Sequence, residues 1–97
     1  MTLELIVAHV MDAARATSPS APGSAWYLFG SILTDPKTAA DIDLLVVYRS
    51  GTDTLKVREA ISPLCLRLPI HLLLLSIEEE QELTFVDTQR CRLLVRL

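Results

Sequence analysis

The stretch Asp41-Ile42-Asp43-Leu44-Leu45-Val46-Val47-Tyr48 decides the fold. Its side chains from Leu44 to Val47 are all apolar, which predicts a strand buried on both faces, because a half-exposed strand would alternate apolar and polar residues. Helices are therefore expected on both sides of the sheet. Asp41 and Asp43 occupy positions i and i+2 of this strand, so their carboxylates are expected to point to the same face.

Outside this strand, apolar periodicity and breaker residues divide the chain into helical and extended segments. Spacings of three and four between apolar residues favour helices, and short apolar runs between Gly, Pro or Ser favour strands. A capping box formed by Ser76 and Glu79 marks the start of one helix. The predicted helices cover 3–16, 55–65 and a segment from 76 onward; the predicted strands cover 26–29, 70–75 and a C-terminal edge strand within 91–97, with a proline-containing loop at 17–24.

The composition supports one small folded domain over residues 1–97. The chain is 51% apolar and 22% charged, with a formal net charge of -3, which excludes the polar, highly charged composition of disordered proteins. We predict the α/β class, of the α+β type, with a small mixed sheet flanked by helices. The predicted order is α-β-β-α-β-α, followed by the short C-terminal strand.

Charge and hydropathy limit the partners of the protein. No apolar run approaches the roughly 20 residues of a membrane span, and residues 1–4 resemble no secretory signal, so a cytoplasmic location without membrane contact is expected. The sequence pI of about 5.2 disfavours binding to a long nucleic acid. A mean hydropathy of +0.38 is high for so small a core and predicts a homodimer or hetero-oligomer through an apolar surface.

The two cysteines, Cys65 and Cys91, lack the spacing of a zinc site or of a redox motif. We therefore interpret both as buried free thiols without chemistry of their own.

The pair Asp41 and Asp43 suits a divalent cation. Mg²⁺ prefers oxygen ligands and is usually held by one or two carboxylates together with substrate phosphates. The alternative is that the two aspartates only solvate the edge of the strand, because a D-x-D pattern alone is common.

Gly30 and Ser31 follow the first predicted strand and precede Asp41 by about ten residues. Glycine lets the backbone approach a phosphate closely, and serine offers a hydroxyl and an N–H group. The alternative is an ordinary turn.

Taken together, the segments Leu28-Phe29-Gly30-Ser31 and Asp41-Ile42-Asp43-Leu44 resemble the G-S…D-x-D signature of the DNA polymerase beta-like nucleotidyltransferase superfamily. The chain looks most like its small stand-alone members, the minimal nucleotidyltransferases of antitoxin type, over nearly its whole length. The resemblance implies that Gly30 and Ser31 bind the phosphates of a nucleoside triphosphate. It also implies that Asp41 and Asp43 hold Mg²⁺, with Mn²⁺ as an alternative and a second metal ion allowed.

One position departs from the family pattern. Active members usually carry a third carboxylate on the third strand, where this chain has His71. A histidine there can serve as a base or ligand, or be a structural side chain. Two interpretations follow. In the first, Asp41, Asp43 and His71 catalyse transfer of a nucleotidyl group such as AMP to a protein hydroxyl, as the antitoxin partner of a helical HEPN-domain protein. In the second, the chain is a catalytically inactive nucleotide-binding or protein-binding antitoxin subunit.

Overall fold

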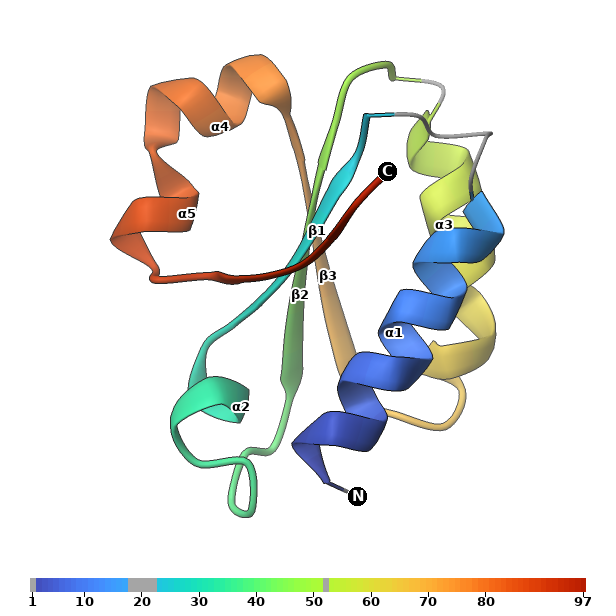
Figure 1. Ribbon diagram of the computed structural model, residues 1–97, viewed down its shortest axis with the longest axis vertical. Coiled ribbons are helices and arrows are strands. Elements are labelled where there is room, and N and C mark those ends of the chain that lie inside the picture. Colours follow the sequence, from blue (N-terminus) through green and yellow to red (C-terminus); the bar gives the residue numbers. More distant parts are fainter. Residues whose placement is uncertain (1, 18–22, 52) are drawn as a thin grey trace.

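A computed structural model of the chain describes residues 2–17, 23–51 and 53–97. Within them the protein is a compact α+β structure with a four-stranded mixed sheet and five helices (Figure 1). In chain order the elements are α1 (Leu3–Thr17), β1 (Ala25–Phe29), α2 (Ser31–Thr34), β2 (Ile42–Tyr48), α3 (Asp53–Cys65), β3 (Ile70–Ser76), α4 (Ile77–Leu83), α5 (Phe85–Thr88) and β4 (Arg92–Arg96). Most of the predicted loop, residues 18–22, lies outside the described residues.

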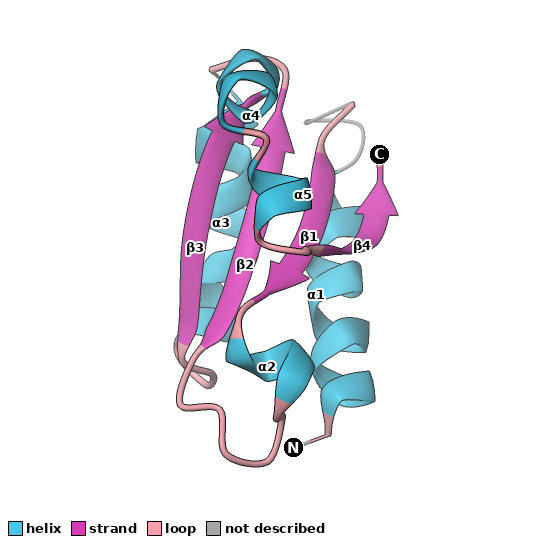
Figure 2. Cartoon of the chain, turned by 90° about the vertical axis from the view of Figure 1, so that its left-hand side faces the viewer, coloured by secondary structure: helices cyan, strands magenta, loops and turns pink. Residues whose placement is uncertain are grey.

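The sheet has the strand order β3-β2-β1-β4 (Figure 2). β1 is antiparallel to both β2 and β4, whereas β2 and β3 are parallel. Parallel neighbours need a crossover connection, and α3 supplies it. The predicted C-terminal strand is confirmed as the edge strand β4.

Side chains of β2 alternate between two apolar clusters, one on each face of the sheet. Leu44 and Val46 face α1 and α3, whereas Leu45 and Val47 face α4 and α5 (Figure 1). The first cluster also includes Ile6, Val10, Trp26, Leu28, Val57 and Ile61, and the second includes Ala25, Tyr27 and Leu75, with Ile77, Phe85 and Val86 packed against it. The prediction of a strand buried on both faces and covered by helices on both sides is therefore confirmed.

The predicted capping box at the start of α4 is confirmed in full. The Glu79 backbone N–H donates to Ser76 Oγ at 3.0 Å, and the Ser76 backbone N–H donates to Glu79 Oε1 at 2.9 Å. The box satisfies backbone groups that the first turn of a helix cannot pair internally. It thereby fixes the sharp change of direction where β3 becomes α4.

The structure also contains two short helices that the sequence pattern does not predict. α2 and α5 have four residues each, which is too short for the three- and four-residue spacing that identifies a helix. α5 follows α4 directly through Thr84, whose φ of 47° ends α4 in the left-handed conformation. These helices supply the two turns beside the ends of β1 and β4.

The prediction of two buried thiols is wrong for Cys65, which is exposed at the end of α3. Helical periodicity does not distinguish the last turn of a helix, where packing ends, from its middle. Cys91 is half-buried. Its burial, reinforced by the negative charge of Glu80, raises the pKa of this thiol to about 11, which suppresses its reactivity at neutral pH.

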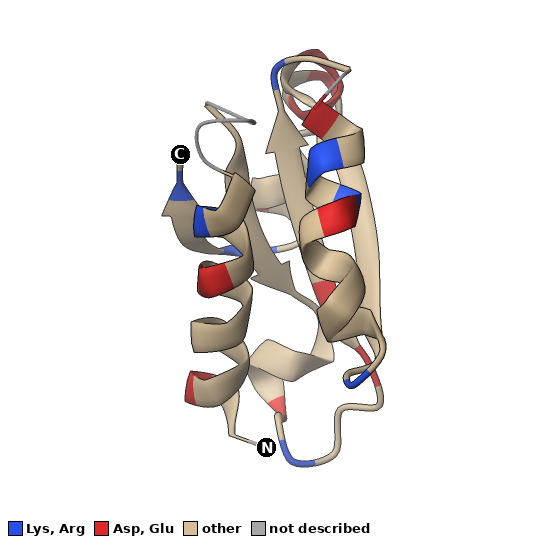
Figure 3. Cartoon of the chain, turned by 90° about the vertical axis from the view of Figure 1, so that its right-hand side faces the viewer, with Lys and Arg blue, Asp and Glu red and all other residues tan. Residues whose placement is uncertain are grey.

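The outer surface of the helices is polar with isolated apolar residues. Acidic and basic residues are interspersed on the side of α1 and α3 (Figure 3), which is typical of solvated helices. The large apolar residues that remain exposed are Leu5, Leu55, Leu66, Leu83 and Leu93. In the described ranges, no helix combines the length and apolar character that crossing a membrane requires.

Removing the capping serine should weaken the β3–α4 corner measurably. We expect Ser76→Ala to lower the free energy of unfolding by about 1 kcal/mol, because an N-cap hydroxyl and its backbone bond are lost. Glu79→Gln is the matched control, since glutamine at this position keeps an oxygen acceptor for the Ser76 N–H. Urea unfolding measures both changes. Equal midpoints for Ser76→Ala and the wild type would show that the capping box contributes nothing to stability.

Candidate functional site

The candidate site begins with one row of residues across three strands. Phe29 of β1, Asp43 of β2 and His71 of β3 are paired in register, so their side chains share one face of the sheet. By the alternation of the strand, this is the face that carries Leu45 and the second apolar cluster. The row lies at the end of the sheet where β1 enters α2.

Gly30 packs directly against the carboxylate of Asp43. A Cβ atom built on Gly30 would overlap Asp43 Oδ2, and its φ of 79° with ψ of -160° falls in a region open to glycine and strained for other residues. Glycine is thus required here for two reasons, the backbone conformation and the space for Asp43. The structure therefore brings Gly30 and Asp43, separated in sequence, to the same end of the sheet.

His71 lies between the two aspartates. Its Nε2 atom is 3.7 Å from Asp41 Oδ1, and its Nδ1 atom is 3.7 Å from Asp43 Oδ1. Both distances exceed a hydrogen bond, so the imidazole is a close neighbour of each carboxylate without being bonded to it. The side chains are 68% exposed for His71, 46% for Asp41 and 27% for Asp43. The site is consequently open to water and to a ligand.

Asp41 and Asp43 reach the same imidazole from the start of β2. Asp41 precedes β2 by one residue, because β2 begins at Ile42 rather than at Asp41 as predicted. The two carboxylates nevertheless approach the two nitrogens of one ring, as expected for side chains on a common face. Ile42, between them, is buried in the opposite cluster.

The donor set can be tested against the chemistry of Mg²⁺. Among the described residues, no group of three or more His, Cys, Asp or Glu side chains is arranged to hold a metal ion. Asp41 and Asp43 are partly exposed carboxylates, the ligand type that Mg²⁺ sites use together with waters and substrate phosphates. Mn²⁺ accepts the same oxygen ligands. Asp41 and Asp43 would thus hold a cation only in combination with a ligand that brings its own oxygens.

Ser31 stands at the surface beside this end of the sheet. It is exposed and opens α2, the single turn whose Leu33 N–H donates to the Gly30 carbonyl at 3.1 Å. The Asp35 N–H donates to the Ser31 carbonyl at 2.8 Å. These bonds hold the backbone of the Gly30-Ser31 turn in place while the hydroxyl-bearing side chain remains accessible.

Sequence reasoning did not identify Phe85 as a neighbour of the site. Its ring packs edge to face on that of Phe29, with centroids 5.1 Å apart and planes at 88°, an arrangement favoured by the aromatic quadrupole. Because Phe29 is the register partner of Asp43, the two phenylalanine rings border the site on the side of α5. No local pattern in the sequence indicates this contact, since α5 itself was not predicted.

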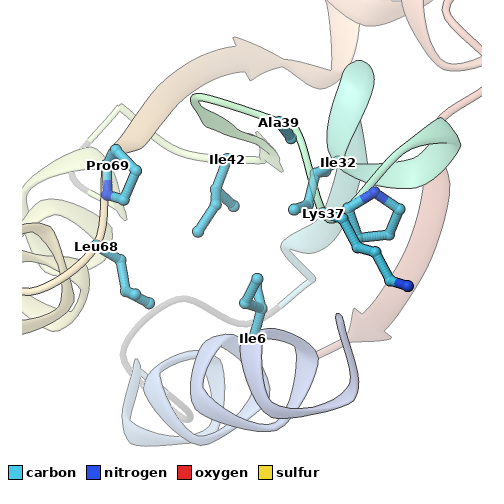
Figure 4. A pocket seen from close by; sticks show the side chains of 8 residues that line it. Ile6, Ile32, Lys37, Ala39, Ile42, Leu68 and Pro69 are labelled. Carbon is cyan, nitrogen blue, oxygen red and sulfur yellow. The ribbon is translucent and has the colours of Figure 1, made fainter. Parts of the chain in front are cut away.

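A separate cavity of about 420 Å³ lies on the other face of the sheet (Figure 4). Ile42 points into it from β2 and Ile6 from α1 (Figure 4). The remaining lining residues are Ile32, Pro36, Lys37, Ala39, Leu68 and Pro69. None of Asp41, Asp43 and His71 borders this cavity, so it does not form part of the carboxylate site.

Substituting Gly30 should reveal how closely the turn and Asp43 are coupled. We expect Gly30→Ala to lower the free energy of unfolding by about 1–3 kcal/mol, through backbone strain and the overlap with Asp43. Adding Asp43→Ala removes the overlap and should restore part of this loss in a double-mutant cycle.

The matched control is Gly51→Ala, because a Cβ at Gly51 meets nothing within 4 Å. That change should leave stability unchanged or raise it by about 0.4–1 kcal/mol. If Gly30→Ala and Gly51→Ala have the same effect in urea unfolding, the close packing of Gly30 on Asp43 is refuted.

The chain matches no protein-family model and no curated protein. A functional conclusion therefore depends on Gly30, Ser31, Asp41, Asp43 and His71 and on the way the fold places them at one end of the sheet.

Proposed function

We propose that the chain is a nucleotidyltransferase-like domain that binds a nucleoside triphosphate with Mg²⁺ and transfers a nucleotidyl group to a protein hydroxyl. The observation that carries the proposal is the convergence of Gly30, Asp41, Asp43 and His71 at one end of one sheet face. A turn without a side chain beside paired carboxylates is suited to a phosphate chain and its cation. The mixed sheet with helices on both faces is compatible with the nucleotidyltransferase fold.

In this proposal each residue has a distinct role. Asp41 and Asp43 hold the cation, which when bound stabilises charge on the attacking and leaving oxygens. Gly30 lets the backbone lie close to the phosphates, and the Ser31 hydroxyl donates a hydrogen bond to a phosphate oxygen. The acceptor hydroxyl forms a bond to the α-phosphorus while the bond to the β-phosphate oxygen breaks, so pyrophosphate leaves with the electron pair.

The proton of the acceptor hydroxyl needs a base at this site. His71 occupies the position of the third carboxylate and lies 3.7 Å from each of the two aspartates. An imidazole can accept a proton near neutral pH, but it brings no negative charge and is a poor ligand for Mg²⁺. We therefore propose that nucleotide binding is intact and that transfer is slow.

A second candidate function follows from the same residue. With histidine at the position of the third carboxylate, the chain would be a binding subunit that retains the fold and the nucleotide site without catalysis. The acidic residues Glu78 and Glu80 do not replace the missing carboxylate within the chain, because α4 starts at the other end of β3. In both versions a helical HEPN-domain protein is the proposed macromolecular partner, as target of transfer in the first and as bound toxin in the second.

Removing one carboxylate should weaken cation-dependent nucleotide binding. We expect Asp43→Asn to reduce the affinity for a non-hydrolysable triphosphate in Mg²⁺ by at least about tenfold. Mutation of residues that only hydrogen-bond to metal ligands already lowers metal affinity by about that factor. Calorimetric titration in Mg²⁺ and in a chelator measures the effect.

Asp12→Asn is the matched control. It makes the same change of charge on an exposed residue of α1, where Asp12 lies 3.5 Å from Arg15. Binding that is equally affected by both substitutions, or that is independent of the cation in the wild type, would contradict the assignment of Asp43 as a metal ligand.

Restoring the third carboxylate should increase transfer. We expect His71→Asp to raise the rate of nucleotidyl transfer to a co-expressed HEPN-domain protein by about a hundred- to ten-thousand-fold, the usual effect of a positioned general base. Transfer of radiolabel from the α-phosphate measures the rate. The variant needs Mg²⁺ in every buffer, because three adjacent carboxylates without a cation repel one another.

The outcomes separate the two functions. A fast wild-type reaction that His71→Asp abolishes would overturn the proposed slow transfer and show that His71 is an efficient base or ligand in place of the third carboxylate. No transfer by either protein, with cation-dependent nucleotide binding retained, would favour the binding-subunit function.

A further inference from the structure

β3 forms one edge of the sheet and pairs only with β2 within the described chain. Its outer side faces no other element there (Figure 2). On an edge strand, alternate residues direct their backbone N–H and C=O groups away from the sheet, where they can pair with another strand. The Ile70 N–H donates to the Leu68 carbonyl at 2.8 Å and the Ser76 N–H donates to Glu79 Oε1 at 2.9 Å. The backbone groups that β3 leaves open at this edge therefore belong to the residues between Ile70 and Ser76.

The two edges of the sheet differ in how they are protected. At the opposite edge, β4 carries Arg92 and Arg96 and has an irregular register with β1. Charged side chains and bulges of this kind discourage pairing with other strands. β3 has neither feature: its register with β2 is continuous over all seven residues, and it contains no Lys, Arg, Asp, Glu or Pro.

The side chains of β3 are less buried than their position in the sheet would suggest. Leu72 and Leu74 are half-buried, whereas their register partners on β2, Leu44 and Val46, are completely buried. Leu72 lies beside Leu44, and Leu74 beside Val46, on the face of the sheet that α1 and α3 cover. The additional exposure of β3 thus comes from the missing neighbour on its outer side, and a further strand would remove it.

We propose that β3 pairs in antiparallel orientation with β3 of a second copy of this chain, joining two four-stranded sheets into one. The strand is complementary to itself. Centred on Leu73, the pairing sets Leu72 opposite Leu74 and His71 opposite Leu75, so no two charged residues of like sign meet. Every molecule of this protein in solution carries the same β3 edge, and a two-fold dimer is the commonest closed assembly.

The pairing also has a consequence for the carboxylate site, which rests on the proposed function. Antiparallel strands set the carboxyl end of one β3 beside the amino end of the other. His71 lies near the amino end, and α4 with its acidic first turn (Glu78, Glu79 and Glu80) begins where β3 stops. Each site would therefore lie at the same end of the joined sheet as the acidic turn of the second copy.

The oligomeric state and a matched pair of edge variants test the proposal. Sedimentation of the full chain should give twice the 10.8 kDa mass of the monomer. Leu73→Lys should weaken self-association by at least about tenfold, because a charge on an edge strand opposes pairing. Leu93→Lys makes the same change on the β4 edge, where Leu93 is 43% exposed, and should leave the dimer intact.

Cysteine crosslinking tests the register even if Leu73→Lys folds poorly. In a Cys65→Ser, Cys91→Ser background, single cysteines are placed at positions 72, 73 and 74, and disulfide-linked dimers should form most at position 73. Identical residues at the two-fold axis are close enough for a disulfide. Leu93→Cys is the control and should remain monomeric under the same oxidation.

Three results would overturn the proposal: a monomer at all concentrations, a dimer insensitive to Leu73→Lys in a folded protein, or crosslinking at position 93 instead of position 73. None of these depends on nucleotide. A dimer that binds no triphosphate would therefore leave the β3 pairing standing while the proposed function failed.

Discussion

The burial of β2 on both of its faces is the constraint on which the rest of the structure depends. Leu44, Leu45 and Val46 have no exposed surface, and each contributes about 1.5–3 kcal/mol relative to an exposed side chain. A shift of the strand by one residue would exchange the two faces and bring Asp43 into the cluster beneath α1 and α3. The register of the sheet, and with it the position of the carboxylates, is thus determined by apolar packing.

The same burial explains why the chemistry lies at one end of β2. An aspartate in the middle of this strand would lose its hydration without a compensating partner. At the amino end of β2, where the helices no longer cover the sheet fully, Asp41 and Asp43 stay in contact with water. Gly30 then comes close because β1 ends beside Asp43. The site therefore combines residues that tolerate solvent with a turn that only glycine can form.

Much of this arrangement could be predicted from the sequence, because it follows from local patterns. The alternating direction of side chains in a strand predicted a common face for Asp41 and Asp43, and the Ser76–Glu79 spacing predicted the start of α4. The short helices α2 and α5, the contact of Phe85 with Phe29 and the exposure of Cys65 could not be predicted. Each depends on how distant segments pack, and four-residue helices carry no periodic signal.

Local patterns did not give the neighbours of β2, and only the family resemblance grouped His71 with the two aspartates. No pattern in the chain states that β3 pairs with β2 in parallel, or that β3 rather than β1 lies at the edge. Long-range pairing depends on the whole set of packed elements. The position of His71 between two aspartates is a result of that pairing, and the imidazole belongs to the site only because β3 lies where it does.

The chain distances within the site also bear on the order in which the protein folds. Asp43 meets Phe29 across 14 residues of chain, but it meets His71 across 28. Contacts between closer segments form faster because less chain entropy is lost before they form. We expect the β1–β2 pair to form first and β3 to dock later. The two carboxylates and Gly30 therefore come together through the shorter-range pairing, and the imidazole joins them through the longer-range one.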